Sequence, residues 1–195
     1  MALHRNSERV AAAAAEKGLD IAIRQFPSGT RTAQDAADAI GCELGAIAKS
    51  IVLMSDAGPL LVLTSGANRV DYDLVAGALG VSGVRRADAD EARAATGYPI
   101  GGTAPWGHPR PLTILCDADL LGYDEVWAAG GTPTRCSGSA PTTCCARPGP
   151  PSSAWPKARA ESAAAAGLRR ATATSWPPGS AAPRLRGHAR SPWGR

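Results

Sequence analysis

The stretch AKSIVLMSDAGPLLVLTSG, residues 48–66, decides the fold. It holds two apolar runs, IVLM at 51–54 and LLVLT at 60–64, which are rich in β-branched residues and leucine. The turn-forming residues Asp56, Ala57 and Gly58 separate the two runs. Apolar runs of this length joined by such a turn predict a β-hairpin.

Helix signals lie on both sides of this hairpin. Thr32 is a good N-cap for a helix that ends before Gly41, and Asp88 with Glu91 forms a capping-box pattern for a helix closed by Gly97. Two further apolar runs, LTILC at 112–116 and DEVWAAG at 124–130, predict strands. Strands that alternate with helices in this way indicate an α/β (α+β) domain.

Charge divides the chain at Pro133. Residues 1–133 carry 11 Lys and Arg against 16 Asp and Glu, a net charge of −5, whereas residues 134–195 carry 10 against one, a net charge of +9. From Thr134 onward there is no Ile, Val, Phe, Tyr or Asp and there are only two leucines. Such a segment cannot bury enough apolar surface to offset the entropy lost on ordering, so we expect it to be disordered.

The composition also bears on location and metal binding. No apolar run is long enough to span a bilayer, and the N-terminal alanines lead directly into Glu16 and Lys17 rather than into a signal-peptide core. We therefore expect a cytoplasmic protein without a membrane partner. The sequence has no CxxC pair and only three histidines, so we expect no metal site.

Four ordered blocks of the chain resemble a known family. They are GTRTAQDAADAIGCELGAIAKSIVL, LVLTSGANRVDYDLVAGALG, RADADEARAATGYPIGGTAPWGH and DEVWAAGGTP, which together run from about Phe26 to Pro133. They are similar to the YbaK-type aminoacyl-tRNA deacylases, the free-standing relatives of the editing domain of prolyl-tRNA synthetase. The resemblance implies a mixed, barrel-like β-sheet surrounded by helices. It also implies hydrolytic removal of a mischarged amino acid from tRNA without a cofactor, with an aminoacyl-tRNA synthetase as a candidate partner.

The departure from the family after Pro133 has a concrete form. The resemblance implies that a hydrophobic strand, a short Ser-Pro-Asp helix and a last strand should follow. Back-translation of RCSGSAPTTCCARPGP (residues 135–150) with GC-rich codons, read in the neighbouring frame, gives AVFRLSPDDLLRATGA, which is that expected ending. We therefore predict a frameshift after Pro133. It would leave an editing-type domain over 1–133 without its last strands and helix, and a basic, low-complexity tail over 134–195.

Two alternatives for the tail stay open. It is either a genuine low-complexity segment or an RNA-binding arm, in which arginines would contact phosphates. The arginines concerned are Arg169, Arg170, Arg184, Arg186, Arg190 and Arg195.

Lys49 is the candidate catalytic residue. It lies in IAKSIVL and matches the functional lysine of the resembled family, where its ammonium group would hold a phosphate or the carbonyl group of the substrate. A surface lysine at the start of a strand is the alternative. Lys49 is, however, the only lysine between Lys17 and Lys157 in a chain that otherwise uses arginine, and together with the resemblance this favours function.

Glycine-rich loops supply the candidate substrate-binding residues. Gly101, Gly102, Thr103, Ala104 and Pro105 match the family's GxxxP loop, in which glycine allows close approach of the backbone and proline fixes the shape. Two further rims are predicted at strand ends, the first of Ser65 and Gly66 and the second of Gly130, Gly131 and Thr132. Plain turns between strands are the alternative for all three.

Two other functions stay open alongside the deacylase. The chain is alternatively a non-catalytic module that binds aminoacyl-tRNA or a small ligand, or an inactive product of truncation. Turnover that is lost on substitution of Lys49 by alanine separates the deacylase from the binding module.

Overall fold

The computed structural model describes residues 3–26, 32–140 and 169–171 of the chain. Its helices are α1 (Arg5–Ala15), α2 (Ala33–Ile40), α3 (Tyr72–Leu79) and α4 (Ala89–Thr96), with the 3-10 turns η1 (Leu44–Ala46) and η2 (Ala118–Gly122). Its strands are β1 (Ala22–Gln25), β2 (Ile47–Ser55), β3 (Gly58–Ser65), β4 (Val84–Arg86), β5 (Thr113–Cys116), β6 (Val126–Ala129), β7 (Arg135–Ser139) and β8 (Arg169–Ala171). The predicted mixed α+β class is confirmed.

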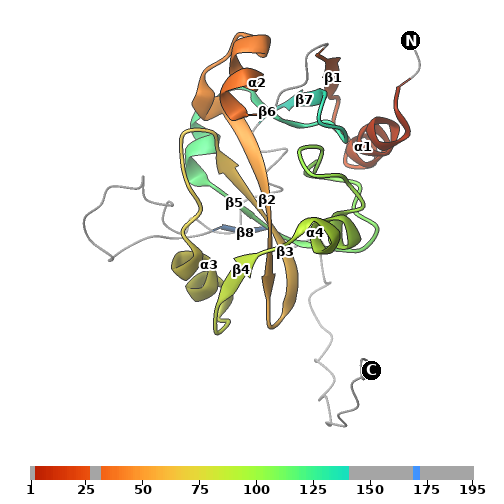
Figure 1. The fold of residues 1–195 in the computed structure, drawn as a ribbon. Coiled ribbons are helices and arrows are strands. Elements are labelled where there is room, and N and C mark those ends of the chain that lie inside the picture. Colours follow the sequence, from red (N-terminus) through yellow and green to blue (C-terminus); the bar gives the residue numbers. More distant parts are fainter. Residues whose placement is uncertain (1–2, 27–31, 141–168, 172–195) are drawn as a thin grey trace, which may run out of the picture.

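The β2–β3 hairpin is the centre of the sheet, as predicted from residues 48–66. Its strands pair antiparallel from Ala48 opposite Ser65 to Ser55 opposite Gly58. Figure 1 shows the hairpin running along the length of the molecule, with α2 near one end and α3 near the other. Strand β6 adds to β2 in parallel, and β5 adds to β3 in parallel.

The predicted helix starts are confirmed by their capping contacts. The Thr32 hydroxyl accepts a hydrogen bond from the Asp35 amide at 3.0 Å, and the Asp35 carboxylate accepts one from the Thr32 amide. Asp88 and Glu91 form the same reciprocal box at the start of α4. Each box satisfies amide groups that the first turn of a helix leaves without partners, so both helices begin where the sequence indicated.

The apolar core lies on both faces of the hairpin. One cluster joins α1, β2, β3 and the loop after α4, and its fully buried members include Val10, Leu61 and Ala104. A second cluster joins β2 and β3 to α3 and β5 through Leu53, Val62, Val75 and Leu115. A third cluster lies under α2 and includes Ile47 and Trp127.

The predicted barrel-like closure of the sheet is wrong. The strand order is β1-β7-β6-β2-β3-β5-β8, with β4 paired to β2 off this path. Within the described part of the chain, the end strands β1 and β8 pair only with β7 and β5, so the sheet stays open. A barrel requires its two outermost strands to pair, and here they stand at opposite ends of the order.

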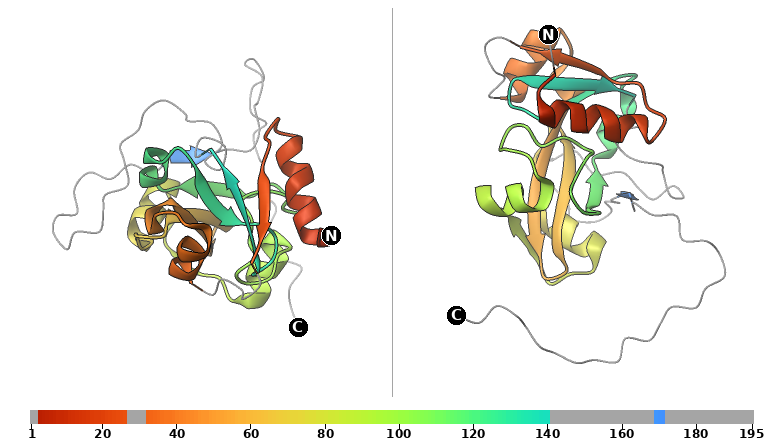
Figure 2. Two further views of the ribbon diagram at one scale, coloured as in Figure 1. Left: turned by 90° about the horizontal axis from the view of Figure 1, so that it is seen from above. Right: turned by 90° about the vertical axis from the view of Figure 1, so that its right-hand side faces the viewer.

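The expectation of disorder from Thr134 onward does not hold for two short strands. Strand β7 pairs antiparallel with both β1 and β6, and strand β8 pairs antiparallel with β5. The residues of β7 form a strand because the backbones of two neighbours supply its hydrogen bonds, although its side chains have low β-propensity. Figure 2 shows β7 beside β1 and α1. The rest of the predicted tail, 141–168 and 172–195, lies outside the described residues.

Candidate functional site

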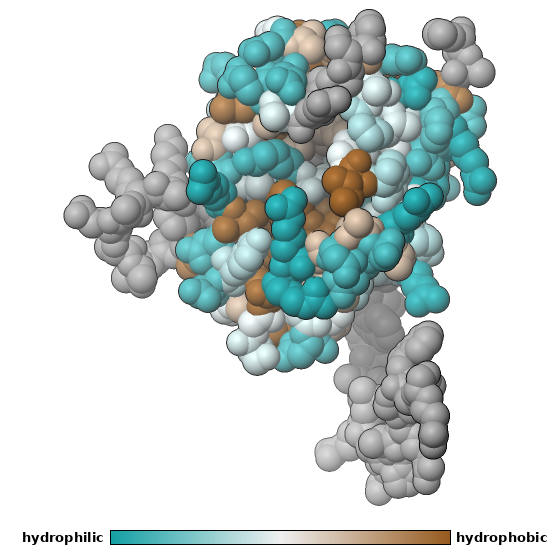
Figure 3. Space-filling view, in the orientation of Figure 1, coloured by the Kyte–Doolittle hydropathy of each residue, from teal (hydrophilic) through white to brown (hydrophobic). Residues whose placement is uncertain are grey.

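A cavity of about 400 Å³ opens between α2, β2, β6 and the loop that follows α4. Three of the predicted site residues line it, namely Lys49 from β2 and Gly101 and Thr103 from the loop. The other predicted site residues lie outside this lining. Apolar side chains such as Ile47 and Ala128 form much of its wall. Figure 3 shows apolar surface gathered near the middle of this face of the molecule and framed by hydrophilic residues.

Lys49 is held by backbone carbonyl groups. Its Nζ donates to the carbonyl oxygen of Gly66 at 3.0 Å and to that of Asn68 at 2.5 Å. The side chain is half-buried on β2, where Thr64 of β3 is its partner across the hairpin. An ammonium group has three donors, so one donor remains beyond these two contacts to the described residues.

Burial and neighbouring charges have opposing effects on the pKa of Lys49. Burial lowers the pKa of Lys49 below its usual value, because desolvation disfavours the charged form. The charge of Asp117 raises this pKa, and the charge of Arg69 lowers it. The ammonium group is therefore easier to deprotonate than an ordinary surface lysine, and Asp117 counteracts the change.

The two predicted glycine loops pack against each other. A Cβ atom on Gly102 would lie 2.8 Å from the Cα of Thr132 and 3.0 Å from the carbonyl oxygen of Gly131. Backbone atoms cannot move aside as the end of a flexible side chain can, so only glycine fits here. Ala104 and Pro105 are buried beneath this contact, and Ala104 belongs to the main core cluster. These residues therefore support the wall that Gly101 and Thr103 present.

Helix α1 holds the 130–132 loop from the other side, a contact that the sequence did not reveal. The Ser7 hydroxyl donates to the carbonyl oxygen of Gly130 at 2.7 Å, and the Asn6 amide group donates to that of Gly131 at 3.1 Å. Gly131 has φ of +91°, and a Cβ atom there would lie 2.8 Å from the backbone of Asn6. No local pattern links residues so far apart in the chain, so this support could not be found from spacing.

The predicted rim of Ser65 and Gly66 contacts Lys49 but lies outside the lining of its cavity. The Ser65 hydroxyl donates to the carbonyl oxygen of Gly45 at 2.8 Å, and Ser65 lines a separate cavity of about 690 Å³ with Asn68 and Asp119. A Cβ atom on Gly66 would meet the carbonyl oxygen of Leu44 at 2.1 Å. Gly66 is thus required for a close backbone approach, and its carbonyl group anchors Lys49.

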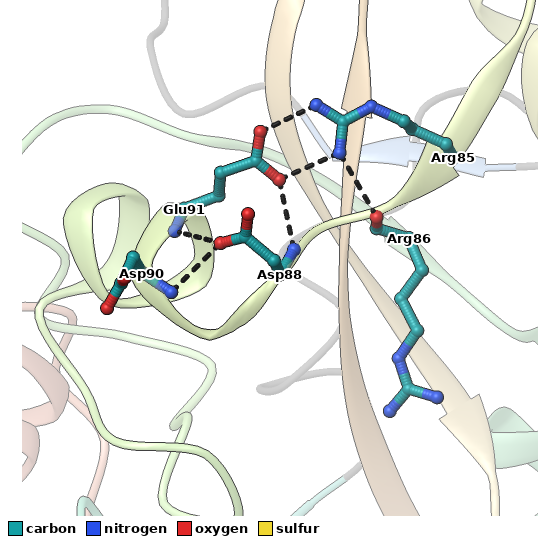
Figure 4. Close-up of polar contacts among 5 residues, drawn as sticks. All are labelled: Arg85, Arg86, Asp88, Asp90 and Glu91. Carbon is teal, nitrogen blue, oxygen red and sulfur yellow. Dashed lines mark hydrogen bonds and ion pairs between the residues drawn. The ribbon is translucent and has the colours of Figure 1, made fainter.

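Two arginines that the sequence analysis did not select also line the cavity of Lys49. Arg86 follows Arg85 on β4, and in Figure 4 the guanidinium group of Arg85 pairs with Glu91 while the Arg86 side chain points away from this pair. Arg135 of β7 also lines the cavity and donates to the side chain of Gln25 at 2.7 Å. With Lys49 they give the cavity a positively charged rim that suits an anionic ligand.

The exposed Ile100 adds an apolar contact surface at the same rim, since 66% of its surface is accessible. Isolated exposed apolar residues are common, but this one lies at the mouth of a cavity.

Neither described histidine lines this cavity. The Nε2 atom of His108 lies 3.2 Å from the carbonyl oxygen of Pro105, and burial lowers the pKa of His108. His108 is thus part of the loop structure between Pro105 and Pro109. In the described ranges, no group of three or more His, Cys, Asp or Glu side chains is arranged to hold a metal ion, and no helix is long and apolar enough to cross a membrane.

Comparisons with known proteins agree with this architecture. The model of the aminoacyl-tRNA editing domain family matches residues 27–138. A solved structure described as that of a candidate trans-editing enzyme for prolyl-tRNA synthetase is 40% identical. Its match has a TM-score of 0.69 and covers 74% of this chain and 94% of that one.

Two curated proteins show the same likeness over shorter or weaker matches. Proline–tRNA ligase of Xanthomonas oryzae is 33% identical over 100 residues, which is 51% of this chain but only 18% of the ligase. The protein YwhH of Bacillus subtilis is 26% identical over 111 residues, which is 56% of this chain and 70% of YwhH. Because the family model spans more than half of the chain and includes Lys49 and both glycine loops, this chain belongs to the aminoacyl-tRNA editing domain family.

Proposed function

We propose that the chain is an aminoacyl-tRNA deacylase, which removes wrongly attached amino acids from tRNA. Lys49 carries this proposal, because it lines a cavity together with Gly101 and Thr103, and its ammonium group has one donor beyond its two carbonyl contacts. Membership of the editing family and the likeness to a candidate trans-editing enzyme support the same activity.

The proposed reaction is hydrolysis of the ester between the amino acid and the terminal ribose of tRNA. A water molecule adds to the ester carbonyl carbon, the bond to the ribose oxygen breaks, and that oxygen takes the proton released by the water. The charge that develops on the carbonyl oxygen is stabilised by the remaining donor of Lys49. The ester is already activated, so orientation and charge stabilisation are enough and no covalent intermediate is required.

The rest of the rim would bind the nucleic acid. Arg86 would offer charge to the phosphates near the 3′ end. Gly101 and Thr103 of the 101–105 loop line the cavity and would hold the aminoacyl group, with the 130–132 loop packed behind them. A volume of about 400 Å³ lies within the range of small-ligand sites. Ser65 and Gly66 take part through the anchor that the Gly66 carbonyl group gives to Lys49.

The partners in this proposal are aminoacylated tRNA and, as a second candidate, a synthetase. One matched relative is a proline–tRNA ligase, in which a segment similar to this chain makes up 18% of the length. We expect this chain to act beside such a ligase. The place of work would be the cytoplasm, where tRNA is charged.

Release of labelled amino acid from charged tRNA tests the proposal. The chain is incubated with tRNA that carries alanine, cysteine or proline, and hydrolysis is followed for the unaltered chain, Lys49→Ala and Lys49→Arg. Removal of one donor to the developing charge is expected to lower kcat roughly 10²- to 10³-fold. Lys17→Ala is the control, because Lys17 is exposed just after α1.

Three outcomes are informative. Turnover that only Lys49 variants lose supports the deacylase. Turnover that survives in Lys49→Ala excludes the proposed role of Lys49. Binding of charged tRNA without turnover in the unaltered chain favours a non-catalytic binding module instead.

A further inference from the structure

A buried carboxylate lies behind the loop that anchors Lys49. Asp117 follows β5 at the start of η2 and is 1% exposed. Its Oδ2 atom accepts hydrogen bonds from the Thr64 hydroxyl at 3.1 Å, the Ser65 amide at 3.0 Å and the Asn68 side chain at 2.9 Å. Its Oδ1 atom accepts one from the Asp119 amide at 3.1 Å.

These contacts converge on the loop that Lys49 binds. The loop runs from Ser65 to Asn68, and its two ends are tied to Asp117 through an amide and a side chain. The carbonyl groups of Gly66 and Asn68, in the same four residues, accept the two hydrogen bonds of Lys49. The loop therefore lies between the carboxylate and the ammonium group and bonds to both.

We propose that Asp117 is a positioning residue for Lys49, which fixes the two carbonyl groups that aim the ammonium group at the substrate. This inference rests on the proposed deacylase function. Capping η2 alone would occupy only the Oδ1 atom, whereas three donors meet the Oδ2 atom and two of them come from the loop. A carboxylate buried at this depth is costly to desolvate, and several hydrogen bonds are needed to offset that cost.

The charge of Asp117 also favours the charged form of Lys49. The charges that act on the pKa of Lys49 are those of Asp117 at the start of η2 and Arg69 after β3. Asp119 accepts a hydrogen bond from the Asn68 side chain at 3.0 Å, and Arg86 lines the same cavity as Lys49. Asp117 raises the pKa of Lys49, against the lowering caused by burial and by Arg69. Without this carboxylate the ammonium group would lose its proton at a lower pH.

The variants Asp117→Asn and Thr64→Val test the proposal. Asp117→Asn keeps the shape but removes the charge. Thr64→Val removes one hydrogen bond from the same carboxylate and leaves its charge and both loop contacts in place. Deacylation is followed against pH, and the pKa of Lys49 is measured by NMR titration. The chain has three lysines, Lys17, Lys49 and Lys157, so loss of a signal in Lys49→Arg assigns the resonance.

We expect Asp117→Asn to lower kcat by about 10- to 100-fold, the loss seen in metal sites when the hydrogen-bond partner behind a ligand is removed. KM should change little. The alkaline limb of the pH profile and the pKa of Lys49 should both move to lower pH. Thr64→Val should leave the pH profile in place. If Asp117→Asn fails to fold, Asn68→Ala frees one end of the loop from Asp117 and Asp119 while the backbone carbonyl group of residue 68 stays, and kcat should fall again.

The outcomes keep this inference apart from the proposed function. An unmoved Lys49 pKa and an unmoved alkaline limb in Asp117→Asn would overturn the positioning role. So would an equal loss of kcat in Thr64→Val. A lowered Lys49 pKa in a protein whose unaltered form has no turnover would instead overturn the deacylase and leave the coupling of Asp117 to Lys49 standing.

Discussion

Two equally buried serines should respond in opposite ways when their hydroxyl groups are removed. Ser7 of α1 and Ser137 of β7 are both fully buried, at 0% exposure. The Ser7 hydroxyl donates to the carbonyl oxygen of Gly130 at 2.7 Å, whereas the Ser137 hydroxyl has no partner among the described residues. The same substitution, serine to alanine, therefore removes a hydrogen bond at one site and an unsatisfied group at the other.

The expected magnitudes follow from these contacts. A buried polar group without a partner costs about 1–3 kcal/mol, so Ser137→Ala should raise the free energy of unfolding by about that amount. Ser7→Ala leaves the carbonyl group of the buried Gly130 without this donor, which costs about 1–3 kcal/mol, and the better helix propensity of alanine returns about 0.5 kcal/mol. Relative to the unaltered chain, the free energy of unfolding should thus rise in Ser137→Ala and fall in Ser7→Ala. The two variants should differ from each other by several kcal/mol.

Denaturant and thermal unfolding of the three proteins measure the effect. For a chain of about 200 residues, each kcal/mol moves the melting midpoint by about 2–4 °C, so the two shifts are resolvable. Destabilisation by Ser137→Ala, on the scale of Ser7→Ala, would refute the reasoning. It would show that the Ser137 hydroxyl has a hydrogen-bond partner that stabilises the folded state.

Two further predictions concern the loops and the surface. Gly102→Ala should cost about 1–3 kcal/mol and reduce activity, since its Cβ atom would press on the backbone of Thr132 at 2.8 Å; Gly77→Ala in α3, where nothing lies within 4 Å, should gain about 0.5–1 kcal/mol. Unfolding curves and deacylation rates of both variants check this, and equal behaviour would contradict it. Arg85 lowers the pKa of the Glu91 carboxyl from 4.5 to about 2. A carboxyl group whose pKa is lower in the folded state stabilises the fold at pH values above its unfolded pKa. This stabilisation is lost as the pH falls through the folded pKa. The stability difference between the unaltered chain and Glu91→Gln should therefore shrink between about pH 5 and about pH 2 in urea titrations, and a constant difference would exclude the pair as its source.

Local signals predicted the central elements correctly. Neighbouring residues specify the hairpin at 48–66 through two apolar runs and a turn. They specify the helices at 33–40 and 89–96 through capping boxes. Among the loop glycines selected from the sequence, Gly102 and Gly131 lie where a Cβ atom would meet the backbone of another segment at 2.8 Å. What these signals do not specify is which strands become neighbours. The barrel-like closure was an expectation from the family resemblance, and the strand order observed here leaves the sheet open.

The candidate site residues selected from the sequence are those that match the resembled family or have an unusual local context. Lys49 stood out as a lone lysine, whereas Asp117 looked like an ordinary residue at the end of an apolar run. Its importance comes from contacts across more than 50 positions in the chain, to Thr64 and Ser65. Arg86 is one arginine among many by sequence, and only the fold places it at the cavity of Lys49.

Strand β7 is the place where local sequence and position disagree most. It lies between β1 and β6, where a strand normally carries apolar or β-branched residues, yet it reads Arg-Cys-Ser-Gly-Ser. Residues 136–139 are all buried, and the Ser137 hydroxyl has no partner in the described part of the chain. The neighbouring reading frame places Val, Phe, Arg and Leu at these four positions, three of which are apolar residues that suit a buried strand.

This mismatch supports the hypothesis that the frame slips after Pro133, so that β7 has the place of the expected strand but not its residues. Sequencing the DNA across codons 130–150 tests it directly, and an extra base would restore the expected ending. A chain with that ending should unfold at higher denaturant and deacylate faster, because β7 then buries apolar side chains beneath the 130–132 loop. Equal stability and equal rates for the two chains would mean that β7 works as written, and the frameshift would then explain nothing about the fold.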